Sequence, residues 1–325
     1  MTPATTRRTL LAALPGLALA APALGQAWPA RQVRLVLPFA AGGAADVVIR
    51  IVAAHMAESS GQAFVVQNIT GGSGNIGTEQ VARAAPDGTT FLVGSPGTLA
   101  INPHMFRNLS FSVERDFVPM AHVATFPQVL VVNPRVPVQT TEELIALARA
   151  RPGQLNYGSG GNGSTGHLIT AMFLHQAGVE VVHVPFRGGA PAAQALVTGD
   201  VQFVIDGLPT WLSYMGTPQI RILGITSAQR WPALPDVPAI GERAVPGFDL
   251  GSWVVLAAPT GTPAEVGERL AELVNRAVAN DEVRRRLAAA GALPAGGTPE
   301  HARRFQRAEL EKWGRVVQVS GARVD

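Results

Sequence analysis

The sequence predicts an α/β fold in which two lobes enclose a ligand cleft. Apolar, strand-like runs alternate with helical patterns through most of the 325 residues, and this alternation favours layered α/β domains with parallel sheets. One arrangement also occurs twice: an apolar run, a glycine-rich loop and a helical pattern follow one another in the segment 35–56 and again from residue 155. Each loop exposes a helix N-terminus, which carries roughly +0.5 elementary charge and unpaired N–H groups. Two such ends facing one cleft would bind a small carboxylate.

The first 27 residues are typical of an export signal. Arg7 and Arg8 precede an apolar run from Leu10 to Ala20, and small residues follow up to Ala27. The run is too short for a membrane-spanning helix, which needs about 20 residues. We therefore expect residues 1–27 to be a cleaved signal peptide and the mature protein to be periplasmic. The double arginine also resembles a twin-arginine signal, so this route and the general secretory route both stay open.

Composition argues against several classes of protein. Once residues 1–27 are removed, 24 basic and 23 acidic residues remain, giving a net charge of +1. No basic stripe interleaved with aromatic residues is present, so we expect no nucleic-acid partner. The absence of cysteine excludes disulfides and thiolate metal sites, and the seven histidines show no metal-binding spacing. We therefore expect neither a metal nor a cofactor.

Local patterns locate several helices and strands. Thr140 and Glu143 form a capping box, Pro263 stands at the first position of a later helix, and Thr298 precedes the last one. Three glycines stand where helices should end: Gly153, Gly178 and Gly291. The strand-like runs are 64–67, 90–93, 129–132, 181–184 and 203–205.

The alternation of strands and helices is interrupted at 124–128 and at 246–253. We expect the chain to cross between lobes at these two places. This predicts a discontinuous first domain, residues 28–128 plus 248–325, and a second domain, residues 129–247.

Gly72 to Gly77 match the G-x-G-x-x-G pattern of dinucleotide-binding loops. Such a site also needs an acidic residue about 20 residues on, at the end of the next strand, to bind the ribose. That strand ends at Val93-Gly94-Ser95, and Asp87 lies in the turn before it. The missing acid argues against a dinucleotide cofactor.

Ser164, within Asn162-Gly163-Ser164-Thr165-Gly166, is similar to the nucleophilic serine of hydrolases. The sequence identifies neither a base nor an acid as its partner, and His167 is too close along the helix. The other interpretation is that Ser164 or Thr165 caps the helix, and a capping hydroxyl can also bind a ligand.

Three charged residues occupy positions where ligands collect. Asp46, in the first turn of a helix, could compensate the helix dipole, contact a ligand amine or hydroxyl, or lie behind the loop. Asp206 ends the strand 203–205, and ligands collect at the carboxyl ends of strands, although a turn cap is an equal interpretation. Arg187, in another strand-to-helix loop, could pair with a ligand carboxylate or be solvated.

Taken in order, these motifs resemble the Bug receptors of tripartite tricarboxylate transporters, which are periplasmic solute-binding proteins. The resemblance covers essentially the whole chain after residue 27. It rests on the segments Pro38 to Asp46, Gly71 to Gly77, Pro86 to Gly88, Asp116 to Pro119, His183 to Gly188, Leu234 to Pro238 and Ala258 to Pro263.

The resemblance implies a two-lobed periplasmic binding protein fold, type II-like, that closes on a small carboxylate without catalysis. It also implies that the loops 39–46 and 158–165 hold the ligand between them, partly through water. Two positions depart from the family pattern: Ala45 replaces a hydroxyl residue, and Gln67-Asn68 replaces Glu-Asn. The expected ligand-binding residues are Phe39, Ala41, Gly43, Ala45, Asp46, Ser95, Gly160, Asn162, Ser164, Thr165 and Asp206.

The sequence thus predicts a monomeric periplasmic receptor, not an enzyme, that delivers an organic carboxylate or amino acid to membrane transporter subunits. One alternative is an exported enzyme, either a serine hydrolase or a dinucleotide oxidoreductase. The other is a ligand sensor with a membrane signalling partner. Because backbone amides do not titrate, we expect affinity to vary little between about pH 6 and 8 unless a histidine lines the cleft.

Overall fold

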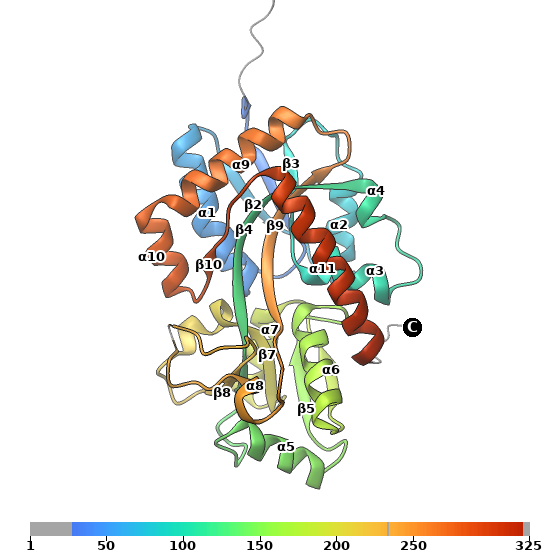
Figure 1. Ribbon diagram of the computed structural model, residues 1–325, viewed down its shortest axis with the longest axis vertical. Coiled ribbons are helices and arrows are strands. Elements are labelled where there is room, and N and C mark those ends of the chain that lie inside the picture. Colours follow the sequence, from blue (N-terminus) through green and yellow to red (C-terminus); the bar gives the residue numbers. More distant parts are fainter. Residues whose placement is uncertain (1–27, 233, 321–325) are drawn as a thin grey trace, which may run out of the picture.

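The computed structural model describes residues 28–232 and 234–320 and has the predicted α/β fold with two lobes (Figure 1). The predicted signal peptide, residues 1–27, lies outside the described residues. The middle of the chain builds the lower lobe in Figure 1, and segments on either side of it build the upper lobe.

A mixed sheet forms the centre of the upper lobe, with strand order β2-β1-β3-β9-β4. Strands β1, β2 and β3 are parallel, whereas β9 is antiparallel to both β3 and β4. Helices cover both faces of this sheet, so alternate residues of β1 enter different hydrophobic clusters: Val36 one, Leu35 and Leu37 the other. The elements outside β4 are β1 (Val33–Leu37), α1 (Ala44–Ser60), β2 (Phe64–Asn68), η1 (Gly72–Gly74), α2 (Asn75–Ala82), β3 (Thr90–Gly94), η2 (Gly97–Ile101), α3 (Asn102–Met105), α4 (Val113–Asp116), β9 (Gly251–Pro259), α9 (Ala264–Ala279), α10 (Asp281–Ala289), β10 (Leu293–Pro294) and α11 (Pro299–Ser320).

The lower lobe continues the sheet in the order β4-β7-β5-β6, with β8 also paired to β4. Strands β5, β6 and β7 are parallel, and β4 is antiparallel to β7 and β8. The elements are α5 (Thr141–Ala150), β5 (Asn156–Ser159), α6 (Thr165–Ala177), β6 (Val182–Pro185), α7 (Gly189–Thr198), β7 (Phe203–Gly207), η3 (Leu208–Tyr214), β8 (Arg221–Ile225) and α8 (Ile240–Arg243).

Strand β4 (Phe117–Val132) runs through both lobes (Figure 1). Its first part pairs with β9, down to Pro127 opposite Gly251, and its last part pairs with β7 from Gln128 onward. Residues 124–128, where the sequence predicts an interruption of the alternation, lie inside this continuous strand, and its partner changes from β9 to β7 there. The domain boundaries at 128 and 248 stay a prediction.

The local helix signals agree with the structure in most places. Thr140 caps α5 by accepting a hydrogen bond from the Glu143 amide, and α11 begins at Pro299. Helix α9 begins one residue later than predicted, so Pro263 is its N-cap residue.

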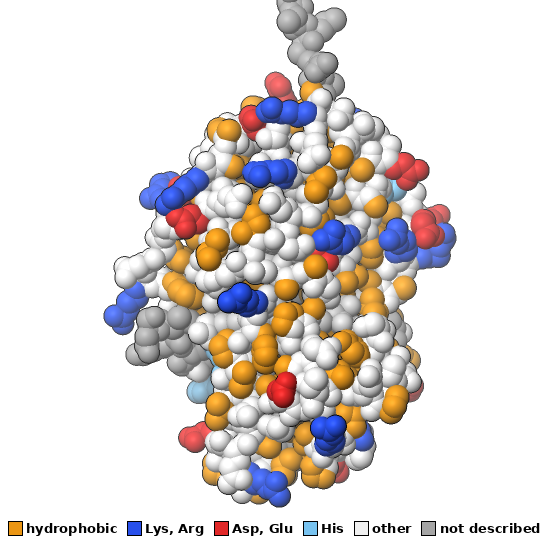
Figure 2. Space-filling model, turned by 180° about the vertical axis from the view of Figure 1, so that it is seen from behind, with side chains coloured by type: hydrophobic (Ala, Val, Ile, Leu, Met, Phe, Trp, Pro, Cys, Tyr) orange, Lys and Arg blue, Asp and Glu red, His pale blue; other side chains and the backbone are white. Residues whose placement is uncertain are grey.

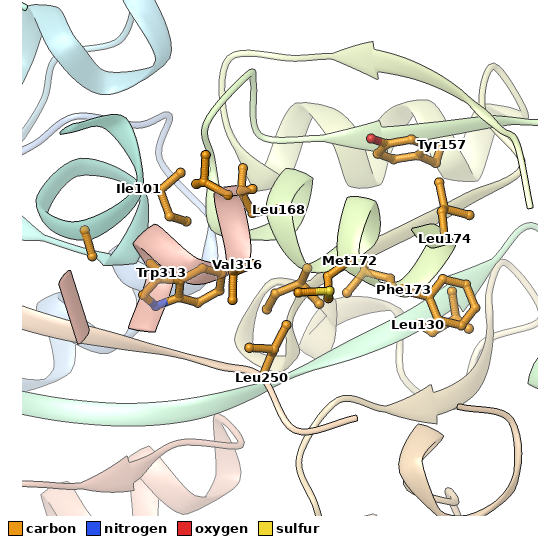
Figure 3. Packing of buried hydrophobic residues seen from close by; sticks show 14 of the residues in the cluster. Ile101, Leu130, Tyr157, Leu168, Met172, Phe173, Leu174, Leu250, Trp313 and Val316 are labelled. Carbon is orange, nitrogen blue, oxygen red and sulfur yellow. The ribbon is translucent and has the colours of Figure 1, made fainter. Parts of the chain in front are cut away.

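The C-terminal helix α11 packs against both lobes. Trp313 and Val316 lie in one buried cluster with Ile101 of the upper lobe and with Leu168 and Met172 of α6 in the lower lobe (Figure 3). Burying an aromatic or aliphatic side chain of this size stabilises a fold by about 1.5–3 kcal/mol. The last helix therefore stabilises the junction between the lobes.

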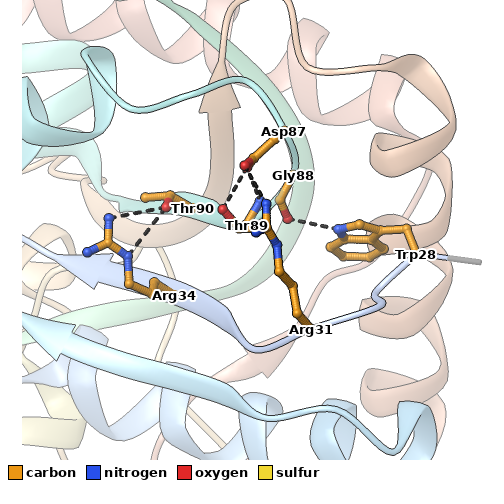
Figure 4. A network of polar contacts seen from close by, with 7 residues as sticks. All are labelled: Trp28, Arg31, Arg34, Asp87, Gly88, Thr89 and Thr90. Carbon is orange, nitrogen blue, oxygen red and sulfur yellow. Dashed lines mark hydrogen bonds and ion pairs between the residues drawn. The ribbon is translucent and has the colours of Figure 1, made fainter. Parts of the chain in front are cut away.

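The first described residues are attached to the turn before β3 (Figure 4). The Trp28 indole N–H donates to Gly88 O (2.8 Å), and Arg31 pairs with Asp87 (2.7 Å). Asp87 also accepts hydrogen bonds from Thr89. Asp87 thus has a structural role at this turn, away from the glycine loop at 72–77.

Surface charge is dispersed on the face shown in Figure 2, where lysine and arginine side chains lie singly or beside acidic ones. Among the described residues, none of the helices has the length and apolarity needed to cross a membrane.

Candidate functional site

A cavity of about 60 Å³ lies between the lobes. At roughly one water per 10–15 Å³ by this measure, it has room for about four to six water-sized groups, which suits a carboxylate with a short stem. We call it the inner cavity. It is lined by Leu37, Phe39, Ala40, Gly43, Ala44, Ala45, Asp46, Ser95, Phe126, Gln128, Gly160, Ser164, Thr165, Gly166, Gly189, Asp206 and Ser252.

The upper wall of the inner cavity is the N-terminus of α1. The first hydrogen bond within this helix runs from Val47 N to Gly43 O (3.0 Å), so the amides of Ala44 and Ala45 precede it. Gly43 is the N-cap residue and offers no side-chain acceptor. These amide donors therefore remain for a ligand.

The lower wall is the N-terminus of α6. Ser164 caps this helix: its hydroxyl accepts a hydrogen bond from His167 N (3.2 Å), and its carbonyl accepts one from Leu168 N (3.1 Å). The amides of Thr165 and Gly166 precede these bonds and lie at the cavity. The capping interpretation of Ser164 is confirmed.

A third helix N-terminus, that of α7, already has a partner. A Cβ atom placed on Gly189 would lie 2.0 Å from Asp206 Oδ2, so this carboxylate sits directly against the first residue of α7. Asp206 also accepts a hydrogen bond from the Thr210 hydroxyl (3.0 Å). Burial raises the pKa of Asp206 to about 6, although hydrogen bonds from the Gly207 amide and Thr210 oppose the change.

Asp46 supports the first glycine loop, residues 38–46. Its carboxylate accepts hydrogen bonds from Gly42 N (3.0 Å), Arg50 Nε (2.9 Å) and Asn68 Nδ2 (3.0 Å), and the Asn68 amide also donates to Phe39 O (2.9 Å). Burial raises the pKa of Asp46, but the bonds from Arg50, Gly42 and Asn68 outweigh it and hold the pKa below its usual value. Of the three roles considered from sequence, the contacts favour a position behind the loop.

Stacked histidines support the second glycine loop, residues 158–165. The Gly163 amide donates to His167 Nδ1 (3.1 Å), and His183 Nε2 lies 2.6 Å from the Ser159 hydroxyl, which also accepts from Gly161 N (3.1 Å). The two rings stack with centroids 4.2 Å apart. Burial lowers the pKa of His167 to about 4 and that of His183 to about 3, so both rings are neutral at pH 7.

Gln128 is a cavity residue that sequence reasoning missed. Its side chain is 1% exposed, and Oε1 has no hydrogen-bond partner among the described residues. Buried polar atoms normally have partners, so an unpartnered amide oxygen in a cavity wall indicates a ligand or water. Within a long apolar strand, nothing in the local sequence distinguishes Gln128 from an ordinary strand residue.

A larger cavity of about 530 Å³, the outer cavity, adjoins the inner one and shares Phe39 and Gly160 with it. Its wall combines the glycines of residues 71–74 with apolar side chains and one cation, Arg187. The full lining is Pro38, Phe39, Thr70, Gly71, Gly72, Ser73, Gly74, Ile76, Gly160, Gly161, Asn162, Pro185, Phe186 and Arg187.

The lobes touch each other beside the inner cavity. The Ala40 amide donates to Arg187 O across the cleft (3.3 Å). A Cβ on Gly188 would lie 3.0 Å from Ala40 N, and its backbone has φ +134°, which side chains rarely adopt. The structure therefore represents a closed arrangement.

Most of the residues expected from sequence line the inner cavity. Asn162 lines the outer cavity instead, and Ala41 is exposed outside both. Besides Gln128, sequence reasoning missed Leu37, Ala40, Ala44, Phe126, Gly166, Gly189 and Ser252.

A family model described as "Tripartite tricarboxylate transporter family receptor" matches residues 48–322. The chain belongs to this receptor family. The resemblance stated from sequence is confirmed, and the family is one of solute-binding receptors.

The receptor is 39% identical over 292 residues to "UPF0065 protein in tcbD-tcbE intergenic region" of Pseudomonas sp. (strain P51), covering 90% of this chain and 87% of the relative. It is 34% identical to "Protein BugT" of Bordetella pertussis, with 94% of each chain covered.

Solved structures agree with the receptor fold. "R. palustris Rpa4515 with adipate" matches with TM-score 0.89 and 40% identity, over 91% of this chain and all of that one. "MatC (Rpa3494) from Rhodopseudomonas palustris with bound malate" matches with TM-score 0.85 and 33% identity, over 89% of this chain and 100% of that one. "Structure of periplasmic binding protein BugD" matches with TM-score 0.87 and 29% identity, over 91% of this chain and 99% of that one. The two-lobed periplasmic binding protein fold is thereby confirmed.

Proposed function

We propose that this chain is a periplasmic receptor that captures a small organic carboxylate in the inner cavity and delivers it to a tripartite tricarboxylate-type transporter. The observation that carries the proposal is the pair of free helix N-termini, α1 from one lobe and α6 from the other, at one cavity between the lobes. Such ends favour an anion, and a ligand that contacts both lobes stabilises the closed state. The adipate and malate in the related structures support the same ligand class.

The two adjoining cavities favour an elongated ligand with a second anionic group. The inner cavity has room for little more than one carboxylate, so a longer stem would extend past Phe39 into the outer cavity. Arg187 there is exposed and takes part in none of the salt bridges of the described residues. Its guanidinium can pair with the distal carboxylate of an adipate-sized dicarboxylate.

Further parts of the proposal concern export, partners and chemistry. We propose export through the segment 1–27, a monomeric receptor, and membrane subunits of the transporter as its partners. Binding without catalysis fits the site better than hydrolysis. The Ser164 hydroxyl accepts a hydrogen bond from the His167 backbone amide, and within the described residues it forms none with a histidine ring. An amino acid is the second ligand class to be tested.

A thermal-shift screen of residues 28–325 tests this function, with adipate, succinate, malate and aspartate as probes. Two matched controls are used: adipamide, which has neither carboxylate, and hexanoate, which has only one. A ligand at 100 times its Kd adds about 2.7 kcal/mol, which raises Tm by several degrees. We expect adipate to shift Tm more than hexanoate, adipamide to have no effect, and Arg187→Gln to remove the advantage of adipate.

Two results would contradict the receptor function. One is that no carboxylate shifts Tm while a dinucleotide does, which would favour the oxidoreductase alternative. The other is hydrolysis of ester substrates that is abolished by Ser164→Ala.

A further inference from the structure

The inner cavity contains acceptor groups as well as amide donors. The Asp206 carboxyl group lies in its wall at the end of β7, and the unpartnered Gln128 Oε1 lies in the wall from β4. Residues 128 and 207 are register partners in adjacent strands, and a Cβ on Gly166 would lie 3.7 Å from Gln128 Oε1. The oxygens of these two residues therefore lie in the same small space that the ligand carboxylate is proposed to occupy.

No cation neutralises Asp206 within the described residues. It accepts hydrogen bonds from Thr210 and the Gly207 amide and lies against the first residue of α7, and α7 carries no ionisable side chain. On α1, Arg50 pairs with Asp46, whose carboxylate adds negative charge to the same cavity wall. The other ionisable groups on elements around β7 are His55 and Glu58 on α1, Tyr157 on β5, His167 and His175 on α6, Arg187 before α7, Tyr214 on η3 and His122 on β4.

These other groups are directed elsewhere. His167 accepts from Gly163 N, Tyr157 stacks on His183, and His122 stacks on Phe305. Arg187 lies in the outer cavity wall, and the Tyr214 ring lies at a tilt beside Trp211. His55 and Glu58 line a separate pocket, and His175 is exposed. A ligand carboxylate in the inner cavity would therefore meet Asp206 without a cation between the two.

We propose that the inner cavity takes up one proton together with the ligand carboxylate that enters it, and that Asp206 holds this proton in a hydrogen bond to the ligand. This inference rests on the proposed function. In this proposal the helix N-termini favour an anionic ligand, and Asp206 adds selectivity because it shares a proton with the ligand carboxylate.

The proton balance follows from the ionisation of the two groups. In the free receptor, burial already raises the pKa of Asp206 to about 6, so the group is mostly ionised above pH 7. A second carboxylate in contact disfavours the charged form further. On binding, the ionised receptor, the ionised ligand and one proton from solvent combine, and no covalent bond of the protein or the ligand changes.

A proton is one of two ways to satisfy these acceptors, and the other is an ammonium group on the ligand. Succinate and aspartate differ by that group. If Asp206 holds a proton, succinate binding takes one up from solvent. If the site is built for an ammonium group, aspartate binds more tightly than succinate and takes up no proton.

Calorimetric titration tests the inference. Adipate and succinate are titrated into residues 28–325 in phosphate and in Tris at pH 7.5, because the difference in heat between buffers measures proton uptake. We expect about one proton per ligand and a Kd that rises about tenfold per pH unit between pH 7 and 8.5. This differs from the weak pH dependence expected from the sequence, which considered backbone amides alone. Asp206→Asn should abolish the uptake and leave less than about a twofold change per pH unit. Asp236→Asn, at an exposed aspartate that lines neither cavity, should keep the wild-type slope.

The possible failures are distinct. Dicarboxylate binding without proton uptake, or uptake that persists in Asp206→Asn, would overturn the role of Asp206 and leave the receptor function in place. Aspartate binding that is tighter than succinate binding and takes up no proton would do the same. If none of the dicarboxylates binds to the wild type, the proposed function itself is wrong.

Discussion

Two aspartates line the inner cavity, and their hydrogen-bond partners give them different roles. Asp46 accepts from Gly42, Asn68 and Arg50, so its charge is satisfied and it holds the first glycine loop in place. Asp206 accepts only from a hydroxyl and an amide, so it keeps capacity for a ligand. Burial raises the pKa of both carboxyl groups, but the bonds that Asp46 receives from Arg50, Gly42 and Asn68 outweigh it and hold the pKa of Asp46 below its usual value.

Asn68 should be needed for both stability and binding. Its amide joins Phe39 O to Asp46 Oδ1, so Asn68→Ala removes one donor from each. We expect the free energy of unfolding to fall by about 1–3 kcal/mol and adipate affinity to fall with it, because the loop at the cavity loses its support. Urea unfolding and calorimetry measure the two effects. The exposed Asn108→Ala is the control, and wild-type affinity in Asn68→Ala would contradict the role given to the loop.

His122 should make the protein less stable in mild acid. Its ring is 4% exposed, and burial together with the nearby His301 lowers its pKa to about 4, although a hydrogen bond with the Ala124 backbone opposes the change. Between about pH 6.5 and 4 the unfolded chain binds a proton that the folded chain does not, so stability decreases as pH falls through this range.

Replacing His122 by phenylalanine should weaken this pH dependence. Between pH 7 and 5, wild type should lose about 2 kcal/mol of unfolding free energy through this group, and His122→Phe should not. Phe305, whose ring lies 4.0 Å from that of His122, offers an aromatic partner for the new side chain. Urea unfolding at the two pH values measures the difference, with the exposed His175→Phe as control. An equal loss in wild type and His122→Phe would refute the assignment.

The site could be predicted from sequence where one residue reveals its role locally. Ser164 precedes a helical pattern and caps it, and Asp206 ends an apolar run, so both were placed correctly beside the cavity. Gln128 and Ser252 were not predicted, since tertiary folding alone brings the middle of β4 and the start of β9 to the cavity. Asn68, which decides the role of Asp46, likewise comes from a neighbouring strand.

At the scale of elements, glycines allow the two lobes to approach closely. A Cβ on Gly97 of η2 would lie 3.2 Å from Gly163 O in the second glycine loop, and one on Gly207 would lie 2.4 Å from Ala44 Cβ. These positions bring backbone of one lobe against the other around the cavity. Closure therefore depends on the absence of side chains as much as on attractive contacts.

Gly97→Ala should weaken closure without weakening the fold. Gly97 has no left-handed backbone strain, and alanine in a helical turn is favoured over glycine by about 0.5–1 kcal/mol. The new methyl group presses on Gly163 O only when the lobes are closed, so we expect adipate affinity to fall several-fold while the ligand-free Tm stays within a few degrees. Ser110→Ala, at an exposed position that lines neither cavity, is the control. Unchanged affinity in Gly97→Ala would show that this contact does not limit closure.

The elements could be predicted from sequence where propensity and burial agree. The runs at 64–67, 90–93 and 203–205 all lie within strands β2, β3 and β7. The exception is β4, because Pro127 lacks an N–H and normally ends a central strand. Here Pro127 lies opposite Gly251, at the point where the partner of β4 changes from β9 to β7. The missing backbone N–H of Pro127 therefore interrupts neither strand pairing.

At the scale of the whole molecule, β4, β9 and α11 connect the lobes. Strands β4 and β9 pair with each other down to Pro127 and Gly251, where the upper sheet ends. On α11, Glu309 accepts from the indoles of Trp253 (2.7 Å) and Trp313 (2.9 Å), which ties the helix to β9. Opening of the cleft would bend the strand pair near these residues and slide α11 over α6, a hinge motion of the kind that binding proteins use.

A disulfide across the cleft should trap this closed state. A Cβ on Gly42 would lie 3.5 Å from Ala190 Cβ, at the short end of the roughly 3.5–4.5 Å found in disulfides. The sequence contains no cysteine, so Gly42→Cys with Ala190→Cys creates a single possible pair. The cost is a side chain at φ +81°, about 1–2 kcal/mol at residue 42.

When oxidised with adipate bound, the double variant should retain adipate through buffer exchange. When oxidised without ligand, it should not bind adipate. Reduction should restore exchange in both cases, and each single-cysteine variant should bind as wild type does after oxidation. Free exchange of adipate in the fully oxidised double variant would show that ligand enters without separation of the two lobes at this point.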